Sequence, residues 1–281
     1  MATSICPVYC RYCTRSYAVG VDTKTVTKAT KKPKRKRWDD MFAYIRSNPQ
    51  VRDVVVSGGD AFMLEPAHLE YIGKGLLSIP NVKRIRIATK GLAVGPMRIT
   101  DDDDAWTATF LNIHAQGRAQ GVSVALHTHF NHPNEITWTT ERAALKLFQH
   151  GVTVRNQTVL LRGINNGVRT MATLIRSLGD INIQPYYVYQ GDMVKGVEDL
   201  RTPLFEINNI QKHLRGITAG YHMPHFVVDL PGGGGKQLAN SYESYDKETG
   251  ISVFKAPAVD KDGDPDKLYF YHDPVKRQAK D

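Results

Sequence analysis

The chain has few cysteines, no long apolar run and no start typical of a secreted protein. Its 281 residues include only three cysteines, all between positions 6 and 13, so no distant partner is present for a disulfide. No stretch of about 18 apolar residues occurs, which is the length that a membrane-spanning helix needs. The first five residues are too few and too weakly apolar for a signal peptide. These absences predict a cytoplasmic protein in a reducing compartment, without membrane contact.

Acidic residues are absent from the most basic part of the chain. The formal net charge is +9, and eight lysines and arginines fall between positions 24 and 37, so the other residues carry about +1. We interpret residues 22–37 as a solvated, mobile basic loop. Contact with nucleic acid and a nuclear-import signal at residues 33–37 (PKRKR) are the alternatives. Because no alternating aromatic residues accompany the run, nucleic acid is not the expected partner.

Apolar residues make up 41% of the chain, enough for the core of one large domain. Short β-branched runs alternate regularly with segments whose apolar residues have helical spacing. The expected strands are residues 51–56, 82–89, 122–126, 152–161, 181–189 and 225–229. The expected helices are residues 38–47, 65–78, 101–120, 140–150, 168–178 and 204–215. This alternation implies parallel strands with right-handed crossovers, so the expected fold class is α/β, a (β/α) barrel or part of one.

The last part of the chain differs in composition from the alternating part. Residues 237–281 are polar, and we expect them to form a C-terminal extension to a barrel that comprises residues 1–236. Two strand-like pieces, residues 251–254 and 268–271, flank an acidic stretch at 260–264. This stretch lacks the closing glutamate of a calcium loop, so we interpret it as a hairpin turn.

Unusual polar, histidine-rich and glycine-rich sequences follow the expected strands. They are Ser57-Gly58-Gly59-Asp60, Thr89-Lys90, His127 to His132, Gln157, Tyr189 to Asp192, and Asp229 to Lys236. In barrels of this kind the reactive groups lie at the carboxyl ends of the strands. Six strand ends would have to acquire such sequences independently if they had no common role. We therefore expect one functional site at this rim.

The three cysteines have the spacing CxxxCxxC, as Cys6, Cys10 and Cys13. Three thiolates can bind three irons of a 4Fe-4S cluster and leave the fourth iron open to a small molecule. The alternative is a zinc site, for which a histidine would have to supply the missing fourth ligand. Beside an open iron, the Ser57–Asp60 turn suggests S-adenosylmethionine, whose amino group the turn would bind. The alternative for the turn is a tight connection from strand to helix.

A run of four glycines, 232–235, precedes Lys236. It is not a phosphate-binding Walker loop, because that loop would need glycine in place of Leu230 and serine or threonine in place of Gln237. A lysine amine on a mobile glycine loop is suited to a Schiff base with an aldehyde such as pyridoxal phosphate. A flexible loop that happens to end in lysine is the alternative.

Charged residues at the same rim are suited to an amino-acid ligand. Asp192 and Asp229 each end a strand, so their carboxylates can converge on one ammonium group, with ordinary salt bridges as the alternative. Arg15 follows the last cysteine and can hold a carboxylate through two parallel hydrogen bonds. His127 and His129 are expected on one face of a strand, where they would bind a metal or make polar contacts to a cofactor.

Taken together, these segments resemble the lysine 2,3-aminomutase family of radical S-adenosylmethionine enzymes. The resemblance runs from Cys6 to about Lys236 and rests on CPVYCRYCTR, VVVSGGDA, HTHFNHPNEIT, NQTVLLRGINN, QPYYVYQGD and FVVDLPGGGGK, in this order. It implies a partial (β/α)6 barrel of the radical S-adenosylmethionine type that lacks the first strand. It also implies an isomerase that moves the 2-amino group of L-lysine to C3 through a pyridoxal phosphate aldimine and needs a reducing electron donor.

The resemblance also implies roles for individual residues. The cluster would be bound by Cys6, Cys10 and Cys13, and Lys236 would be the catalytic, pyridoxal-binding lysine. The substrate carboxylate would be bound by Arg15, and the substrate's side-chain ammonium by Asp192 and Asp229. Further contacts to cofactors would come from Ser57, Gly58, Gly59, Asp60, His129, Gln157 and Tyr189. Two aspartates favour a cationic substrate over glutamate.

Some positions depart from the family pattern. Lys90 stands where the family usually has arginine, Gly191 where it has cysteine, and the C-terminal zinc-binding cysteines are absent. Alternatives to free lysine as substrate are arginine and a lysine on a protein. A further alternative is an inactive family remnant whose basic loop binds nucleic acid or a partner. A homo-oligomer is left open.

Overall fold

The computed structural model describes residues 1–22, 24, 27–29, 34–259 and 264–274. The chain forms two compact units. Unit 1 comprises Met1–Phe130, Asn134–Asn156 and Asp180–Gln184, and unit 2 comprises Asn131–Pro133, Gln157–Gly179 and Pro185–Asp281. Most of the expected acidic turn at 260–264 and part of the expected basic loop lie outside the described residues.

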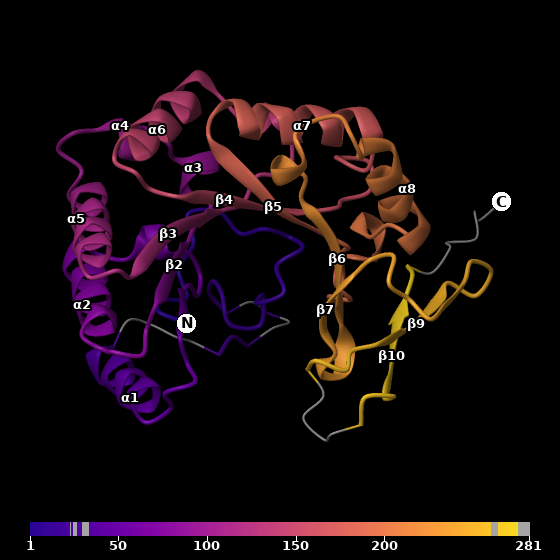
Figure 1. The fold of residues 1–281 in the computed structure, drawn as a ribbon, viewed down its shortest axis with the longest axis horizontal. Helices are drawn as coiled ribbons and strands as arrows, with labels where there is room; N and C mark the ends of the chain where they lie inside the picture. The colour runs from indigo at the N-terminus through magenta and orange to yellow at the C-terminus, as the bar shows by residue number, and fades with distance from the viewer. Residues whose placement is uncertain (23, 25–26, 30–33, 260–263, 275–281) are drawn as a thin grey trace. The chain divides into compact units, whose positions relative to one another are not determined.

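Unit 1 is built from parallel strands that alternate with helices. Its strands are β1 (Asp53–Val56), β2 (Arg84–Ala88), β3 (Ser123–Thr128) and the first half of β4 (Val154–Val159). Its helices are α1 (Arg35–Arg46), α2 (Pro66–Leu77), α3 (Gly91–Val94), α4 (Met97–Thr100), α5 (Ala105–Ala119) and α6 (Trp138–Gln149), with the short 3₁₀ turn η1 (Ala61–Met63) and the last two residues of η2 (Pro133–Glu135). Each strand pairs in parallel with the next. Helices α2 and α5 lie on one side of β1 to β3, and the N-terminal segment lies on the other (Figure 1).

Local sequence signals explain where the helices of unit 1 begin and how they pack. The Asp104 carboxylate accepts a hydrogen bond from the Thr107 N–H at 2.7 Å, so α5 begins after Asp104. Thr137 and Thr140 cap α6 reciprocally. Helices α2 and α5 approach closely at Gly73, where an added Cβ would lie 2.5 Å from the Ile113 side chain. Their buried apolar faces therefore form the core beside the sheet.

Unit 2 contains the larger part of β5 (Ile183–Tyr189), which pairs in parallel with β6 (His225–Leu230) so that Tyr187 is opposite His225. Its helices are α7 (Val168–Asp180) and α8 (Leu204–Leu214), with 3₁₀ turns η3 (Glu198–Leu200), η4 (Gly220–His222) and η5 (Pro231–Gly233). Strand β7 (Gly235–Leu238) runs antiparallel to β6. A separate antiparallel sheet follows, made of β8 (Ser244–Asp246), β9 (Ile251–Lys255) and β10 (Leu268–His272) in the order β10-β9-β8.

The six expected strands are all present as β1 to β6, and within each unit they pair in parallel with their neighbours in the sequence. This confirms the α/β class. The expected strand-like pieces at 251–254 and 268–271 are also confirmed, as the antiparallel neighbours β9 and β10. The boundary expected at 236/237 stays a prediction, and β7 includes residues on both sides of it. None of the helices in the described part of the chain has the length and apolar character needed to cross a bilayer.

Two expected boundaries are wrong. Helix α1 begins at Arg35, so the last three basic residues are helical and do not belong to a loop; burial of Trp38 on this helix outweighs the mutual repulsion of their charges. The long helix expected from residue 101 begins only at Ala105, because Asp104 is its cap. Residues 91–100 instead form the short helices α3 and α4.

The N-terminal segment is hydrogen-bonded to the turn that follows β1. Thr3 forms a parallel bridge with Gly58, and its carbonyl accepts from the Gly59 N–H at 2.7 Å. The Ile5 carbonyl accepts from the Asp60 N–H at 2.8 Å. Arg37 of α1 donates to the Ala2 carbonyl at 3.1 Å. The segment that leads into the cysteine loop is thus fixed to the end of β1 by backbone hydrogen bonds.

Alanine at Gly59 should destabilise the protein by about 1–3 kcal/mol, the usual range for overpacking. A Cβ at this position would lie 2.2 Å from the Ile5 carbonyl oxygen, so the N-terminal segment would have to move away. Urea unfolding followed by circular dichroism measures the change. Gly220→Ala is the control, because an added Cβ there has open space. Equal stability of the two variants would contradict this account of the turn.

Candidate functional site

The three cysteines lie together in an irregular loop of unit 1. Cys6, Cys10 and Cys13 are free thiols and are half-buried. Burial, with the nearby Asp60 carboxylate and the other two cysteines, raises the pKa of the Cys6 thiol to about 12. The thiols are therefore close enough to interact electrostatically. At neutral pH Cys6 stays protonated unless a bound metal displaces the proton.

The number of thiols decides which metal group the loop can hold. In the portion of the chain that the structure describes, no three histidine, cysteine or carboxylate side chains are arranged as ligands of a single ion. An iron–sulfur cluster distributes three thiolates over three separate irons, and this loop supplies three thiols. The donor set therefore fits such a cluster, while the zinc alternative, which needs a fourth ligand, stays open.

Arg15 joins the cysteine loop to the turn after β1. Its backbone N–H donates to the Cys13 sulfur at 3.4 Å. Its guanidinium donates to the Gly58 carbonyl at 3.0 Å and to the Ser57 hydroxyl. The guanidinium is half-buried, so a ligand carboxylate can still reach it. The cofactor and substrate contacts expected of Arg15 and of the turn stay predictions.

Asp60 is the buried anchor of the same turn, with only 5% of its surface exposed. Its carboxylate accepts from the Phe62 N–H at 2.8 Å and from the Lys90 N–H at 2.7 Å. Burial nevertheless raises the pKa of this carboxyl group above its ordinary value. The carboxylate thus connects the end of β1 to the end of β2.

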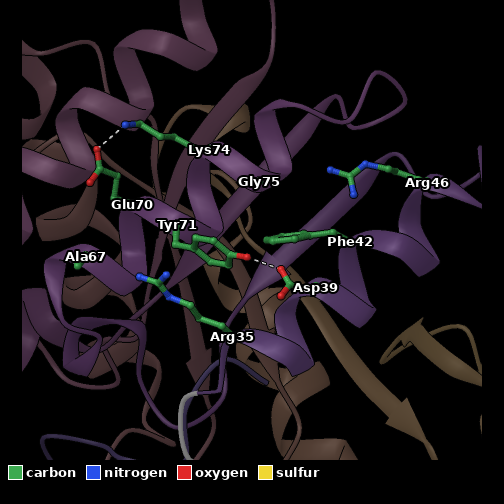
Figure 2. A pocket seen from close by; sticks show the side chains of 9 residues that line it. All are labelled: Arg35, Asp39, Phe42, Arg46, Ala67, Glu70, Tyr71, Lys74 and Gly75. Carbon is green, nitrogen blue, oxygen red and sulfur yellow. Dashed lines mark hydrogen bonds and ion pairs between the residues drawn. The ribbon is translucent and has the colours of Figure 1, made fainter.

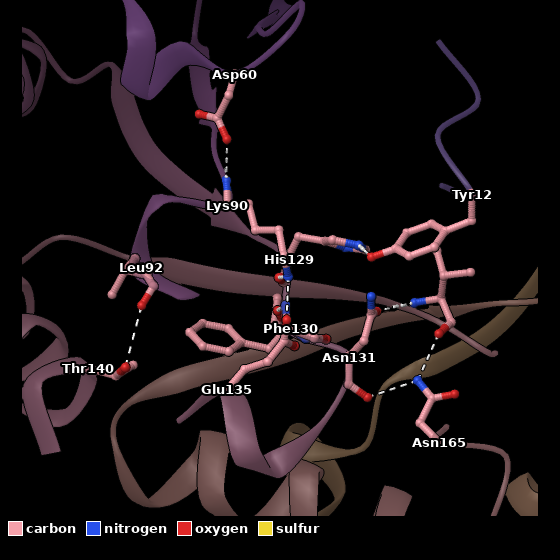
Figure 3. A network of polar contacts seen from close by, with 12 residues as sticks. Tyr12, Asp60, Lys90, Leu92, His129, Phe130, Asn131, Glu135, Thr140 and Asn165 are labelled. Carbon is pink, nitrogen blue, oxygen red and sulfur yellow. Dashed lines mark hydrogen bonds and ion pairs between the residues drawn. The ribbon is translucent and has the colours of Figure 1, made fainter. Parts of the chain in front are cut away.

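Lys90 and His129 form a second connection, which Figure 3 shows beside Asp60. The Lys90 ammonium donates to the Glu135 carboxylate at 2.6 Å and to the His129 carbonyl at 2.8 Å. The His129 imidazole lies 3.0 Å from the Tyr12 hydroxyl, within the cysteine loop. The lysine at the position where the resemblance expects an arginine is therefore engaged within unit 1. It holds the segment after β3 against the cysteine loop.

The two histidines that were expected on one face are in different surroundings. His127 is buried in β3, and burial, with the charges of Arg86 and Arg155, lowers its pKa to about 4. His129 follows the end of β3 and contacts Tyr12. Since β3 ends at Thr128, only His127 lies within the strand, and the metal or cofactor contact expected of the two histidines stays a prediction.

In unit 2, Asp192, Asp229, Lys236 and Tyr189 lie at the ends of β5 and β6. Asp229 is directly opposite Lys236 in the β6–β7 pairing, with 3.1 Å between the Lys236 Nζ and the Asp229 Oδ2. The Lys236 Nζ lies 5.8 Å from the centre of the Tyr189 ring. Burial, followed by the charge of Asp229, raises the pKa of Asp192 to about 6, although Lys236 and Arg201 oppose this. Two carboxylates and one amine therefore share this cluster.

Lys236 was expected at the end of a glycine loop, but it lies in a strand that a glycine turn precedes. Gly232 and Gly233 have positive φ angles of 75° and 95°, which reverse the chain after β6. Gly235 already pairs with Leu230, so Lys236 belongs to strand β7. The glycines make a tight reversal that aims the lysine at Asp229. Gln157, also expected at the site, lies half-buried in β4 in unit 2.

Sequence reasoning missed Arg201 and Tyr271, which are buried in unit 2 beside the segment that carries Asp192. Tyr271 lies beyond the resemblance, and Arg201 is in none of the motifs that carry it. A prediction of which charged residues are buried would have singled out Arg201, because a buried guanidinium needs partners.

A surface groove of about 460 Å³ lies between α1 and α2 in unit 1 (Figure 2). Its lining consists of Arg35, Asp39, Phe42, Arg46, Ala67, Glu70, Tyr71, Lys74 and Gly75. Arg35 lies 5.0 Å from the centre of the Tyr71 ring, and the Tyr71 hydroxyl donates to Asp39. None of the site residues predicted from the sequence lines this groove. It is therefore not part of the candidate site.

Asparagine at Asp192 should stabilise the protein at pH 7 by about 1 kcal/mol, after allowance for solvent. The folded chain raises the pKa of Asp192 from 3.8 to about 6, so the native state holds this proton more tightly than the unfolded state. The contribution of Asp192 to stability therefore falls as pH rises from about 4 to about 6, and the amide removes this loss. Urea unfolding between pH 4 and pH 7 measures it.

The control for this prediction is Asp246→Asn. Asp246 is exposed, and its hydrogen bonds with Thr249 and Glu248 lower its pKa, so its amide variant should gain nothing at pH 7. A loss of stability in Asp192→Asn at pH 7 would contradict the prediction, because it would mean that ionising Asp192 does not cost the folded protein free energy.

Comparison with known proteins places the chain in a family. Residues 211–244 match a family model described as lysine-2,3-aminomutase. L-lysine 2,3-aminomutase of Clostridium subterminale is 42% identical over 236 residues, which cover 84% of this chain and 52% of that protein. Glutamate 2,3-aminomutase of Clostridioides difficile is 38% identical over 234 residues, covering 83% and 51%. The chain spans about half the length of these relatives.

Solved structures share the fold at low identity. The structure of anSMEcpe with bound AdoMet has a TM-score of 0.53 and 13% identity, and the likeness covers 76% of this chain and 55% of that one. Streptococcus suis SuiB bound to S-adenosylmethionine has a TM-score of 0.54 and 12% identity, covering 81% and 48%. These structures confirm the fold expected from the sequence. By its similarity of sequence over 84% of its length, the chain belongs to the lysine 2,3-aminomutase family.

Proposed function

We propose that the chain provides the active site of an aminomutase that moves the 2-amino group of L-lysine to C3, giving β-lysine. The observation that carries the proposal is the cluster of Asp192, Asp229 and Lys236 at the ends of β5 and β6. Two carboxylates side by side attract an ammonium group and repel a carboxylate. They favour lysine as the substrate, although one relative is a glutamate 2,3-aminomutase.

The raised pKa of Asp192 supports an ammonium as the ligand of this cluster. Burial and the neighbouring Asp229 both disfavour a second negative charge. A bound cation relieves that repulsion, because it stabilises both ionised carboxylates at once. In the described structure Lys236 partly supplies this charge through its contact with Asp229 at 3.1 Å. A substrate ammonium would supply this positive charge when the Lys236 amine is bound to pyridoxal phosphate.

Lys236 is the residue that fits pyridoxal phosphate. When bound, that cofactor would supply the electron delocalisation that migration of an amino group requires. The Lys236 side chain is 43% exposed, so an aldehyde can reach its amine. Asp229 lies close enough to accept the proton that the ammonium must release before its nitrogen can react. The glycines before Lys236 carry no side chains that would block the approach.

The cysteine loop fits the part of the reaction that involves S-adenosylmethionine. A cluster on Cys6, Cys10 and Cys13 would supply the electron that starts the radical reaction of S-adenosylmethionine, with an external reductant as its source. Arg15 offers a half-buried guanidinium for a carboxylate, and the Gly58 carbonyl offers an acceptor for an amino group. Both groups belong to unit 1, beside the thiols. We assign them the binding of amino-acid head groups.

An anaerobic assay tests the proposal. The protein is reconstituted with iron, sulfide and pyridoxal phosphate, then incubated with L-lysine, S-adenosylmethionine and dithionite. We expect β-lysine by mass spectrometry, and no product from glutamate or arginine, because the aspartate pair repels the first and the guanidinium of the second is larger and planar. To test lysine within a protein as the substrate, a lysine-rich polypeptide is incubated in the same assay and then digested, and the digest is searched for β-lysine.

Lys236→Ala should abolish β-lysine formation and the visible absorbance of the bound pyridoxal phosphate. Lys212→Ala, an exposed lysine on α8, is the matched control and should keep both. A protein with full cluster and pyridoxal absorbance that turns over none of these substrates would contradict the proposed activity. Turnover of glutamate in preference to lysine would contradict only the assigned substrate.

A further inference from the structure

Arg201 is a deeply buried cation in unit 2, with 3% of its surface exposed. Its guanidinium donates to the Glu198 carboxylate at 2.9 Å and to the Tyr271 hydroxyl at 3.1 Å. It also donates to the His272 carbonyl and, at 3.4 Å, to the Gly191 carbonyl. A guanidinium without partners in this position would be very costly, so these groups are held in fixed places around it.

Tyr271 of β10 brings the C-terminal sheet to the same point. Its side chain is 1% exposed, and its hydroxyl donates to the Gly191 carbonyl at 2.6 Å across a separation of 80 residues. The same hydroxyl accepts from Arg201. The Gly191 carbonyl therefore receives two hydrogen bonds, one from each of these residues. In Figure 1, β10 lies next to β6 and β7 of the same unit.

Gly191 directly precedes Asp192, and the residue before it is fixed as well. The Gln190 N–H donates to the Val227 carbonyl of β6 at 2.7 Å, and its buried side chain donates to the Thr202 carbonyl. The Asp192 carboxylate, in contrast, receives no hydrogen bond from any residue that the structure describes; burial and the charges of Asp229, Lys236 and Arg201 act on it. Its position is therefore set through the backbone of Gln190 and Gly191.

We infer that Tyr271 and Arg201 are positioning residues for the proposed ammonium site: they fix the Gly191 carbonyl and, through it, hold the Asp192 carboxylate beside Asp229. The inference rests on the proposed function, since it takes the aspartate pair as the site of the substrate ammonium. It makes the C-terminal sheet a part of that site. Neither residue touches the substrate; both act through the segment that ends β5.

The test compares Tyr271→Phe with Tyr245→Phe. Tyr271→Phe removes the hydroxyl but keeps the buried ring. Tyr245→Phe is matched, because its hydroxyl donates to Asp273 at 2.6 Å in the same small sheet without contact to Gly191. In the assay above, Tyr271→Phe should raise the KM for L-lysine about 10-fold and change kcat less than about 3-fold. Tyr245→Phe should leave KM unchanged. Arg201→Lys, which keeps the charge but loses the planar fork, should also raise KM.

A second readout does not depend on catalysis. If Asp192 loses its fixed place, solvent lowers its pKa, so the fall in stability between pH 4 and pH 6 that it causes should disappear in Tyr271→Phe. The fall should persist in Tyr245→Phe. Equal KM values and equal pH profiles for the two variants would overturn the inference and leave the proposed function intact. A changed pH profile in a protein that forms no β-lysine would overturn the proposed function and keep the positioning role.

Discussion

Buried charges at the strand ends must be satisfied by hydrogen bonds, and much of this structure depends on how they are satisfied. Asp60 in unit 1 and Arg201 in unit 2 are buried, Lys90 in unit 1 is largely buried, and each is bonded to backbone groups of segments distant in the sequence. An ionised group that loses its partners in such a place costs several kcal/mol. These groups therefore fix irregular segments that strand pairing alone would leave loose.

In both units, hydrogen bonds to charged groups fix the irregular segments, but the side chains that these segments surround differ. In unit 1 the fixed segments surround the thiols, and the turn with Gly59 can lie against the N-terminal segment only because it has no side chain there. In unit 2 they surround a pair of carboxylates and a lysine. Burial raises the pKa values of both Cys6 and Asp192, which shows that ionising these groups costs free energy in the folded chain. Such groups are typical of sites that gain stability when a metal or a cation binds.

Similarity of sequence and the geometry of the site answer different questions about this chain. Similarity of sequence identifies the family over 84% of this chain, yet that family includes relatives named for lysine and for glutamate. The choice between these substrates rests on charge. Asp192 and Asp229 share one cluster with Lys236, and two neighbouring carboxylates favour a cation over an anion as ligand.

The sequence by itself determined the order of strands and helices, because periodicity and capping are local properties that short segments display. It also indicated the cysteine loop, through the spacing of the cysteines, and the Ser57–Asp60 turn and the aspartates, because these follow strands directly. The tertiary structure alone decided what those residues meet. Lys236 lies in β7 because two glycines reverse the chain, and Tyr271 reaches Gly191 across 80 residues. Contacts at such separations depend on the packing of whole elements, which no local pattern encodes.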